Sequence, residues 1–190
     1  KYLDMGRRFK VPYQEGDIET DVKVLGKKVE KAVSDFSKTS GKKFELWFEP
    51  GKFLVSGSGH FLVKTNVIKQ TTATVFAGIN SGFNHLIRPM FYDSYHIIEN
   101  LSNPKGKERI YTVVGNICET DTFAWDRKLN EVHEGDILVF RNAGAYGFEM
   151  SSNFNSRLKP AEVLFLDGKA HLIRKRDEFE DLLRNQIEVL

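Results

Sequence analysis

The spacing of apolar residues in the first quarter of the chain changes from that of a strand to that of a helix and back. Residues 2–5 and 44–48 are short apolar segments. Between them, every third or fourth residue from 22 to 36 is apolar, with lysines on the opposite side, which predicts an amphipathic helix. We expect this helix to be capped by Thr20 and to end at Gly41. A strand, a helix and a second strand predict a right-handed parallel unit, as in an α/β barrel.

Beyond residue 55 the spacing becomes the alternation typical of β-strands, interrupted by clusters of Gly, Asn and Pro. The alternating segments are residues 60–69, 71–77, 95–101, 109–118, 136–141, 161–166 and 169–175. Asp167-Gly168 predicts a tight type I′ hairpin between the last two. Several short strands at this spacing predict an antiparallel β-sandwich or barrel. Asp177 and Glu180 have the spacing of a capping box, which predicts a terminal helix.

We therefore expect two parts in this chain. Residues 1–55 are predicted to hold the last strands and helix of an α/β barrel, and residues 56–190 an antiparallel β-domain with a terminal helix. The first residues have the pattern of the end of a buried strand, and no initiating Met precedes them. We expect the chain to be the C-terminal piece of a longer protein.

Composition narrows the classes of function. The chain is 41% hydrophobic and 28% charged, which is typical of folded domains. Its 28 Lys and Arg and 26 Asp and Glu are interspersed and leave a net charge of +2, so we expect no nucleic-acid partner. The single cysteine, Cys118, excludes an internal disulfide and a cysteine-built zinc site, and the five histidines have no metal-ligand spacing. Apolar runs are short and no secretory leader is found, so we expect a cytoplasmic protein without a membrane segment.

The segment Glu49-Pro50-Gly51-Lys52 is the first that carries candidate chemistry. It follows the second predicted strand, at the edge where α/β barrels place their active sites. A Pro-Gly turn there leaves backbone N–H groups free for an anion, and Lys52 adds a positive charge. The alternative is a strand-ending turn with a solvated lysine, and the segment taken alone favours it.

Three further segments carry polar groups suited to a small ligand. Arg88 and Tyr92 are four residues apart, so on a helical turn they share a face and can grip a carboxylate together. Cys118-Glu119 ends an apolar strand, which predicts a thiol and a carboxylate at the rim of a sheet. The small residues around Tyr146 predict either a helix start packed against a ligand or a capped connection. Taken singly, a surface arginine and a buried structural cysteine are the more common situations.

Read in order, these segments resemble the diaminopimelate decarboxylases, a family of fold-type III enzymes that depend on pyridoxal phosphate. The matching segments are Leu3-Asp4-Met5-Gly6, Glu49-Pro50-Gly51-Lys52, residues 84–89 with Tyr92, Val114-Gly115, Cys118-Glu119, Gly144-Ala145-Tyr146, residues 150–157 and residues 160–162. They cover nearly the whole chain but only the C-terminal half of a family member. The resemblance implies the end of a (β/α)8 barrel followed by the β-domain. It also implies decarboxylation of meso-2,6-diaminopimelate to L-lysine and carbon dioxide, the final step of lysine biosynthesis.

The same resemblance implies the roles of individual residues. It assigns to pyridoxal 5′-phosphate the residues Gly6, Glu49, Pro50, Gly51, Lys52 and Tyr146. It assigns to the substrate Lys52, Arg88, Tyr92, Glu119 and Tyr146. Glu119 reads the ammonium end of the substrate, and Cys118 is catalytic, returning a proton to the substrate after carbon dioxide leaves. Because Cys118 and Glu119 come from the partner subunit in the family, the resemblance implies a homodimer with shared active sites.

The chain departs from the family pattern in two places that bear on the cofactor. The phosphate loop usually reads Gly-Gly-Gly, whereas this chain has Gly6-Arg7-Arg8, whose side chains crowd the phosphate if these positions need positive φ. Lys52 stands where arginine is common. A lysine keeps the positive charge but cannot bind an anion through two parallel N–H donors as a guanidinium does. The lysine that binds the cofactor belongs to a part of the family outside this sequence, so we expect this chain alone to be inactive.

Other interpretations remain open. One is another fold-type III decarboxylase acting on ornithine, arginine or carboxynorspermidine, although Glu119 and residues 151–155 favour diaminopimelate. A second is a non-catalytic relative that kept the fold, which the Arg7-Arg8 change favours. A bare β-domain interaction module is disfavoured by the Glu-Pro-Gly and Cys-Glu pairs.

Overall fold

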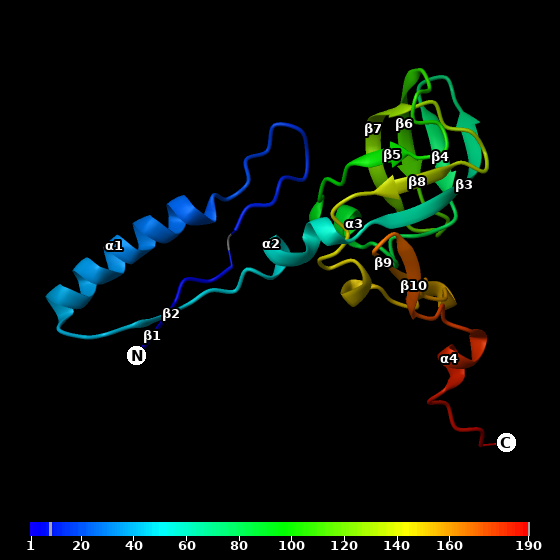
Figure 1. Ribbon diagram of the computed structural model, residues 1–190. Helices are drawn as coiled ribbons and strands as arrows, with labels where there is room; N and C mark the ends of the chain where they lie inside the picture. The colour runs from blue at the N-terminus through cyan, green and yellow to red at the C-terminus, as the bar shows by residue number, and fades with distance from the viewer. Residues whose placement is uncertain (8, 190) are drawn as a thin grey trace.

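The computed structural model describes residues 1–7 and 9–189. Its first part is a pair of parallel strands, β1 (Tyr2–Asp4) and β2 (Glu45–Trp47), with Leu3 opposite Leu46. The long helix α1 (Val22–Ser40) connects them, as the apolar spacing predicts. In Figure 1, α1 lies at one end of the molecule, away from the large sheet of the second part.

The C-terminal end of α1 is as the sequence predicts, whereas its N-cap is not. Gly41 ends the helix in the left-handed conformation, with φ +65°, as predicted. The prediction of Thr20 as N-cap is wrong: the cap is Asp21, whose carboxylate accepts two amide N–H groups of the first turn, both at 2.9 Å. Thr20 is not available, because its hydroxyl accepts the N–H of Lys10 in the preceding loop at 2.7 Å.

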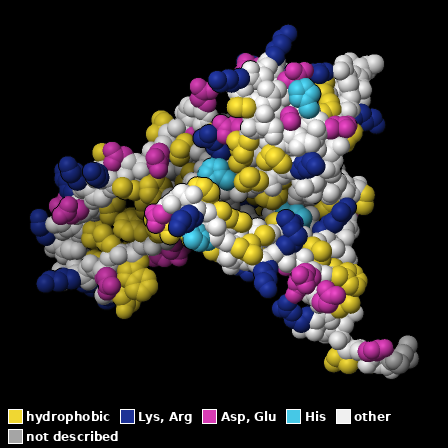
Figure 2. Space-filling view, turned by 45° about the vertical axis from the view of Figure 1, so that its right-hand side comes forward, with side chains coloured by type: hydrophobic (Ala, Val, Ile, Leu, Met, Phe, Trp, Pro, Cys, Tyr) yellow, Lys and Arg dark blue, Asp and Glu magenta, His cyan; other side chains and the backbone are white. Residues whose placement is uncertain are grey.

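The apolar face of α1 is on the surface, and no residue of this helix is buried. Hydrophobic side chains accordingly gather over the N-terminal part, at the left of Figure 2. The exposed ones in this part include Val22, Val24, Phe36, Trp47 and Phe48. An amphipathic helix that follows a parallel strand is typical of the outer layer of an α/β barrel, and the described residues hold one such strand–helix–strand unit.

The second part is built on a six-stranded sheet in the order β5-β8-β3-β4-β6-β7. Its strands are β3 (Phe61–Gln70), β4 (Val75–Ile79), β5 (Ile98–Asn100), β6 (Glu108–Val114), β7 (Thr122–Asn130) and β8 (Ile137–Phe140). The edge strands β5 and β7 contact each other, so the sheet is nearly closed (Figure 1). The side chains that fill it include Ala77, Ile79, Tyr111, Val113, Leu138 and Phe140.

The sheet corrects the predicted all-antiparallel arrangement. β4 and β6 run parallel, with Ala77 opposite Val113, because the chain crosses between them through the short helix α3 (Arg88–Tyr92) and β5. The apolar pattern also does not predict β7. Three charged residues in succession interrupt its alternation, and the first of them, Asp126, has φ +46° where the β6–β7 ladder is irregular.

Three strands are clearly shorter than predicted, and the one expected over 95–101 is reduced to β5, Ile98–Asn100. The strand expected over 71–77 begins at Val75, since residues 71–74 form a turn in which the N–H of Thr71 donates to the carbonyl of Thr74 at 2.8 Å. The strand expected over 109–118 ends at Val114, and the chain then folds back so that the N–H of Gly115 donates to the carbonyl of Asp121 at 2.7 Å. Cys118 therefore lies on a turn and does not end a strand.

The hairpin of β9 (Glu162–Leu166) and β10 (Lys169–Arg174) forms its own two-stranded sheet, apart from the six-stranded one. The predicted type I′ turn is confirmed, since Asp167 and Gly168 both have positive φ, at 51° and 72°. The terminal helix α4 (Phe179–Leu183) begins one residue later than predicted, with Glu178 and Asp181 as its capping box. Asp177 is not the N-cap as predicted, because its carboxylate accepts the N–H of Lys159 at 3.1 Å.

The two parts meet around a short helix, α2 (Gly51–Val55), which continues into the 3-10 turn η1 (Ser56–Ser58). Two further 3-10 turns, η2 (Phe148–Met150) and η3 (Phe154–Ser156), follow the sheet. The loop before α1 contacts the second part directly, since Nδ2 of Asn142 donates to the carbonyl of Pro12 at 2.9 Å. No helix among the described residues is both long enough and apolar enough to cross a membrane.

Candidate functional site

The ends of the two parallel strands form an open turn. Gly6 follows β1 with φ +72°, and its carbonyl accepts the N–H of Glu49, which follows β2, at 2.9 Å. A side chain at Gly6 or at Gly51 would meet no atom within 4 Å, so the space beside both residues is free. Gly51 begins α2, and the first amide groups of a helix have no partner within it. The open space and the N–H donors at the start of α2 fit the phosphate of a cofactor, whereas the N–H of Gly6 already donates to Oδ1 of Asp4 at 2.8 Å.

Arg7 alters the charge at this turn. Its Nε lies 3.3 Å from Oε2 of Glu49, and both side chains are mostly exposed. The ion pair partly neutralises the carboxylate that the family resemblance assigns to the cofactor ring. Arg8, the second departure from the glycine pattern, lies outside the described residues. The backbone of the turn thus fits an anion such as a phosphate, while Arg7 occupies the Glu49 carboxylate.

Three tyrosine rings surround the guanidinium of Arg88. Its Cζ lies 5.5 Å from the ring centroids of both Tyr13 and Tyr146, and 5.9 Å from that of Tyr92. Lys52 reaches the same Tyr13 ring, with Nζ at 5.4 Å from the centroid. Contacts between cations and aromatic faces orient both charged groups. We call these five residues the arginine cluster, and it joins all but one of the residues assigned to the substrate.

Arg88 keeps hydrogen-bond donors for an anion. Its Nη2 donates to Oγ of Ser94 at 3.1 Å, and its buried Nε has no hydrogen-bond partner among the described residues. Arg88 and Tyr92 are the first and last residues of α3, one turn apart, as the sequence predicts. A carboxylate is suited to this site, because a guanidinium can donate to both of its oxygens.

Tyr13 is a member of the arginine cluster that sequence reasoning missed. Its hydroxyl lies 3.1 Å from Oγ of Ser56, which is fully buried, and its ring packs edge-on against His96 with centroids 5.5 Å apart. No local motif marks it, because its partners come from three segments far along the chain. Tyr13 therefore links the loop before α1 to both cations of the site.

The position of Tyr146 depends on a close approach of two backbone segments. Gly144 lies so near α2 that an added Cβ would be 2.0 Å from the carbonyl oxygen of Val55. Its N–H donates to the carbonyl of Ser56 at 3.1 Å. Tyr146 itself has φ +60°, an uncommon conformation for a residue with a side chain. This arrangement holds the Tyr146 ring against Arg88, so the small residues that precede Tyr146 serve close packing.

His96 is buried beside the arginine cluster. Its Nδ1 lies 2.8 Å from the carbonyl oxygen of Arg141. Burial lowers the pKa of His96 below its usual value, and the positive charges of Arg88 and Arg127 lower this pKa further. The ring is therefore neutral near pH 7, and its role is to pack against Tyr13.

Cys118 and Glu119 are exposed on a turn, residues 115–121, which we call the thiol turn. Sγ of Cys118 is 3.5 Å from Oε2 of Glu119, and Nδ2 of Asn155 donates to the same oxygen at 3.4 Å. Arg157 adds a hydrogen bond from Nη2 to the carbonyl of Asn116 at 3.2 Å. Within residues 1–7 and 9–189, no hydrogen bond, ion pair or aromatic contact joins Cys118 or Glu119 to the arginine cluster.

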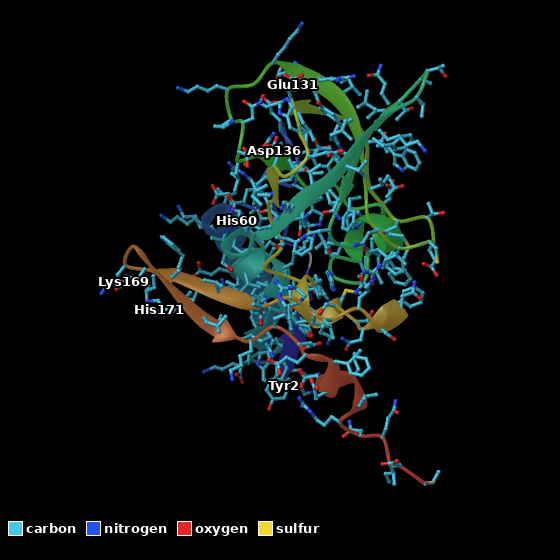
Figure 3. All side chains as sticks on the ribbon, turned by 90° about the vertical axis from the view of Figure 1, so that its right-hand side faces the viewer. Tyr2, His60, Glu131, Asp136, Lys169 and His171 are labelled. Carbon is cyan, nitrogen blue, oxygen red and sulfur yellow. The ribbon has the colours of Figure 1, made fainter. Side chains whose placement is uncertain are left out.

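The histidines are dispersed over the molecule. Figure 3 shows His60 near the start of β3 and His171 on the β9–β10 hairpin. Across the described part of the chain, no group of three or more His, Cys, Asp or Glu side chains is placed to hold a metal ion. Glu131 and Asp136, labelled at the far end of the sheet in Figure 3, are structural: Nδ2 of Asn100 donates to the Glu131 carbonyl and to Oδ2 of Asp136, both at 2.8 Å.

Comparison with known proteins identifies the family. Residues 52–144 match the model of the pyridoxal-dependent decarboxylase C-terminal sheet domain. The chain is 40% identical over 190 residues to the diaminopimelate decarboxylase of Methanothermobacter thermautotrophicus, covering 98% of this chain and 44% of that protein. It is 37% identical over 182 residues to the diaminopimelate decarboxylase of Campylobacter jejuni, covering 95% of this chain and 44% of that protein.

Solved structures agree with these relatives. The diaminopimelate decarboxylase of M. jannaschii in complex with L-lysine matches with a TM-score of 0.90 and 31% identity, covering 100% of this chain and 43% of that one. That of Helicobacter pylori, also complexed with L-lysine, matches with a TM-score of 0.84 and 30% identity, covering 97% and 44%. The chain spans less than half the length of the relatives that it matches.

The chain thus carries the C-terminal sheet domain of the pyridoxal-dependent decarboxylase family, and the nearly closed six-stranded sheet is its core. Within that family the relatives found over nearly its whole length are diaminopimelate decarboxylases, to whose C-terminal part it corresponds. The family resemblance drawn from the sequence is confirmed.

Proposed function

We propose that this chain supplies the C-terminal part of a pyridoxal-phosphate-dependent diaminopimelate decarboxylase. The enzyme converts meso-2,6-diaminopimelate to L-lysine and carbon dioxide. The observation that carries this proposal is the arginine cluster, in which Arg88, Lys52 and Tyr146 lie together beside the open turn at Gly51. In this proposal residues 1–55 complete a (β/α)8 barrel, residues 56–190 form the second domain, and the protein acts in the cytoplasm, where the exposed thiol of Cys118 stays reduced.

The residues of the open turn are proposed to hold the cofactor. Bound pyridoxal phosphate supplies a conjugated ring that accepts the electrons of the broken carbon–carboxylate bond. The turns at Gly6 and at Pro50-Gly51 enclose the phosphate, and the N–H donors come from the start of α2 at Gly51, since proline has no N–H. Lys52 adds positive charge, and Glu49 lies beside the ring. Tyr146 contacts both cofactor and substrate. A dianionic phosphate needs several donors and at least one cation, and this turn provides both.

The substrate is proposed to be held at its two charged ends. Arg88 and Tyr92 grip a carboxylate through the free donors of the guanidinium and the phenol. Glu119 binds the distant ammonium group. Cys118 holds a proton on Sγ and transfers it to the carbon from which carbon dioxide has left.

A homodimer with shared active sites is part of this proposal. Two observations support it: Cys118 and Glu119 are exposed, and no hydrogen bond, ion pair or aromatic contact among the described residues joins either of them to the arginine cluster of the same chain. A second copy can place its thiol turn against this cluster, so that one chain supplies Arg88 and the other Cys118. Light scattering of the active enzyme tests this point, and an active monomer contradicts it.

A non-catalytic relative is the second candidate, and the Arg7–Glu49 ion pair favours it because it occupies the carboxylate that the cofactor ring requires. Another amino-acid decarboxylase is the third; a lysine decarboxylase from Selenomonas ruminantium matches with 20% identity, which supports the fold alone.

The test uses a polypeptide of the relatives' full length that carries this chain, supplied with pyridoxal phosphate. Lysine release is measured with meso-diaminopimelate, and product release with ornithine, arginine and carboxynorspermidine in parallel. We expect lysine from meso-diaminopimelate and its loss in Arg88→Ala. Turnover of ornithine, arginine or carboxynorspermidine instead contradicts the assignment of meso-diaminopimelate as the substrate. Cofactor binding without turnover of any of the four compounds supports the non-catalytic relative.

A further inference from the structure

The thiol turn is held from its base by one buried carboxylate. Asp121 is 5% exposed, and both of its oxygens accept amide N–H groups in the interior. Oδ2 accepts the N–H of Ile117 at 3.0 Å, within the turn itself. Oδ1 accepts the N–H of Phe83 at 2.7 Å, from the loop that leads from β4 towards Arg88. One side chain thus joins the two segments that carry the thiol and the guanidinium.

The packing around Asp121 leaves this carboxylate no freedom. An added Cβ at Gly115 would lie 1.9 Å from Oδ2, and the N–H of Gly115 donates to the carbonyl of Asp121 at 2.7 Å. The N–H of Asn116 donates to the carbonyl of Ser81 at 3.0 Å, a second bond between the same two segments. Ile117 is buried against the β4 loop, so the turn is fixed at its base while Cys118 and Glu119 stay exposed.

Burial is costly for a carboxylate, and the structure shows that cost. Desolvation raises the pKa of Asp121, and the nearby Glu119 adds to the rise, while the N–H groups of Ile117 and Phe83 oppose it. An apolar residue would avoid this cost but would leave two buried amide groups without acceptors. A buried aspartate is therefore explained by the two amides that it fixes.

We propose that Asp121 is the positioning residue of the thiol turn, which holds Cys118 and Glu119 in register with the loop that leads to Arg88. The proposal rests on the proposed roles of Cys118 and Glu119 in the decarboxylation. It assigns no chemistry to Asp121 itself, which acts through the two amide groups. The isosteric change Asp121→Asn removes one acceptor and turns an amide donor towards one of these N–H groups, so it loosens the turn without opening a cavity.

The first test measures the alkylation of Cys118 by iodoacetamide in the full chain, followed on the Cys118 peptide by mass spectrometry. We expect Asp121→Asn to alkylate about threefold faster or more, because Sγ is released from the Glu119 carboxylate. Asp126→Asn, a change at an exposed aspartate of β7, is the matched control and is expected to react like the unaltered chain. An unchanged alkylation rate in Asp121→Asn overturns the proposal.

The second test needs no variant, and so it holds even if Asp121→Asn does not fold. In an NMR pH titration of the unaltered chain, the amide protons of Phe83 and Ile117 are expected to shift together, with one midpoint above 3.8, the ordinary value for aspartate. Glu119 lies within the turn and raises the pKa of Asp121, and Arg157 donates to the carbonyl of Asn116 in the same turn. Glu119→Gln separates the titration of that carboxylate from the titration of Asp121. Two amide protons that titrate independently, or not at all, contradict the shared acceptor.

The third test connects the turn to activity in the full-length holoenzyme. Asp121→Asn is expected to lower kcat/KM for meso-diaminopimelate about tenfold or more, as small misplacements of reacting groups do. If Cys118→Ser and Glu119→Gln leave the activity unchanged, the proposed roles of these residues fail, while the alkylation and NMR results still decide the role of Asp121. An active Asp121→Asn enzyme beside inactive Cys118→Ser and Glu119→Gln enzymes overturns the positioning role.

Discussion

Tyr13 offers the sharpest test of how the site is assembled, because one side chain contacts Ser56, Lys52, Arg88 and His96. The change Tyr13→Phe removes only the hydroxyl and its hydrogen bond to Oγ of Ser56 (3.1 Å). A hydrogen bond of this kind contributes about 1 kcal/mol to the free energy of unfolding. With a urea dependence of about 2 kcal/mol per molar, the midpoint of unfolding falls by about 0.5 M.

Tyr13→Ala removes the ring as well. Two cation–aromatic contacts contribute about 0.5–1 kcal/mol each. The edge-on contact with His96 contributes about 0.5–1.5 kcal/mol. Together with the hydroxyl, these contributions amount to about 2.5–4.5 kcal/mol, which is an upper range because contacts that share one side chain are not additive.

The assay is equilibrium unfolding in urea, followed by tyrosine and tryptophan fluorescence. Tyr2→Phe is the matched control, because its side chain is mostly exposed and it lies outside the arginine cluster. We expect the order Tyr2→Phe, Tyr13→Phe, Tyr13→Ala in decreasing stability. If both Tyr13 variants unfold within about 0.5 kcal/mol of the control, as ordinary surface changes do, the link between the loop and the arginine cluster is refuted.

Three further predictions follow from other parts of the structure. Gly144→Ala is expected to lower the free energy of unfolding by about 1–3 kcal/mol in urea, because its Cβ meets the carbonyl oxygen of Val55 at 2.0 Å; an unchanged midpoint contradicts this close approach. Arg7→Gly frees Glu49 and is expected to tighten the binding of pyridoxal phosphate to the full-length enzyme, measured by absorbance titration. Adding Arg8→Gly is expected to increase the effect, and an unchanged dissociation constant contradicts this prediction. Burial lowers the pKa of His96, so below pH 6.5 this histidine binds more protons in the unfolded chain than in the folded one. The free energy of unfolding therefore falls as the pH drops from 7 towards 5, and His96 contributes at most about 1.4 kcal/mol per pH unit to this fall. His96→Leu is expected to flatten that slope, and an unaltered slope contradicts the assignment.

Local chemistry was sufficient to predict some elements of the fold. The type I′ turn at Asp167-Gly168 and the helix end at Gly41 follow from the backbone preferences of these residues, and both are observed. The caps of α1 and α4 shifted because tertiary partners claimed the predicted residues: Thr20 binds the N–H of Lys10, and Asp177 binds the N–H of Lys159. Such competition depends on the folded arrangement and has no local signature.

In the site, too, the residues that lie in local motifs could be predicted, and those positioned by distant partners could not. Lys52, Arg88, Tyr92 and Tyr146 lie in recognisable segments, and the structure brings them together. Tyr13 was missed because its partners are distant in the sequence. Asp121 was missed because it lies beyond a strand expected to continue to Cys118. The apolar Ile117 supported that strand, but it is buried within a turn, and an apolar residue alone does not distinguish a buried turn from a strand.

The most direct measurement of the central claim is a crystal structure of the full-length protein that carries this chain, with pyridoxal phosphate and L-lysine bound. We expect the phosphate within hydrogen-bond distance of backbone N–H groups at the Gly6 and Gly51 turns, the carboxylate of lysine at Arg88, and Cys118 of a second subunit facing the same cavity. A phosphate bound away from both turns, with Arg88 in contact with neither ligand, would contradict this claim.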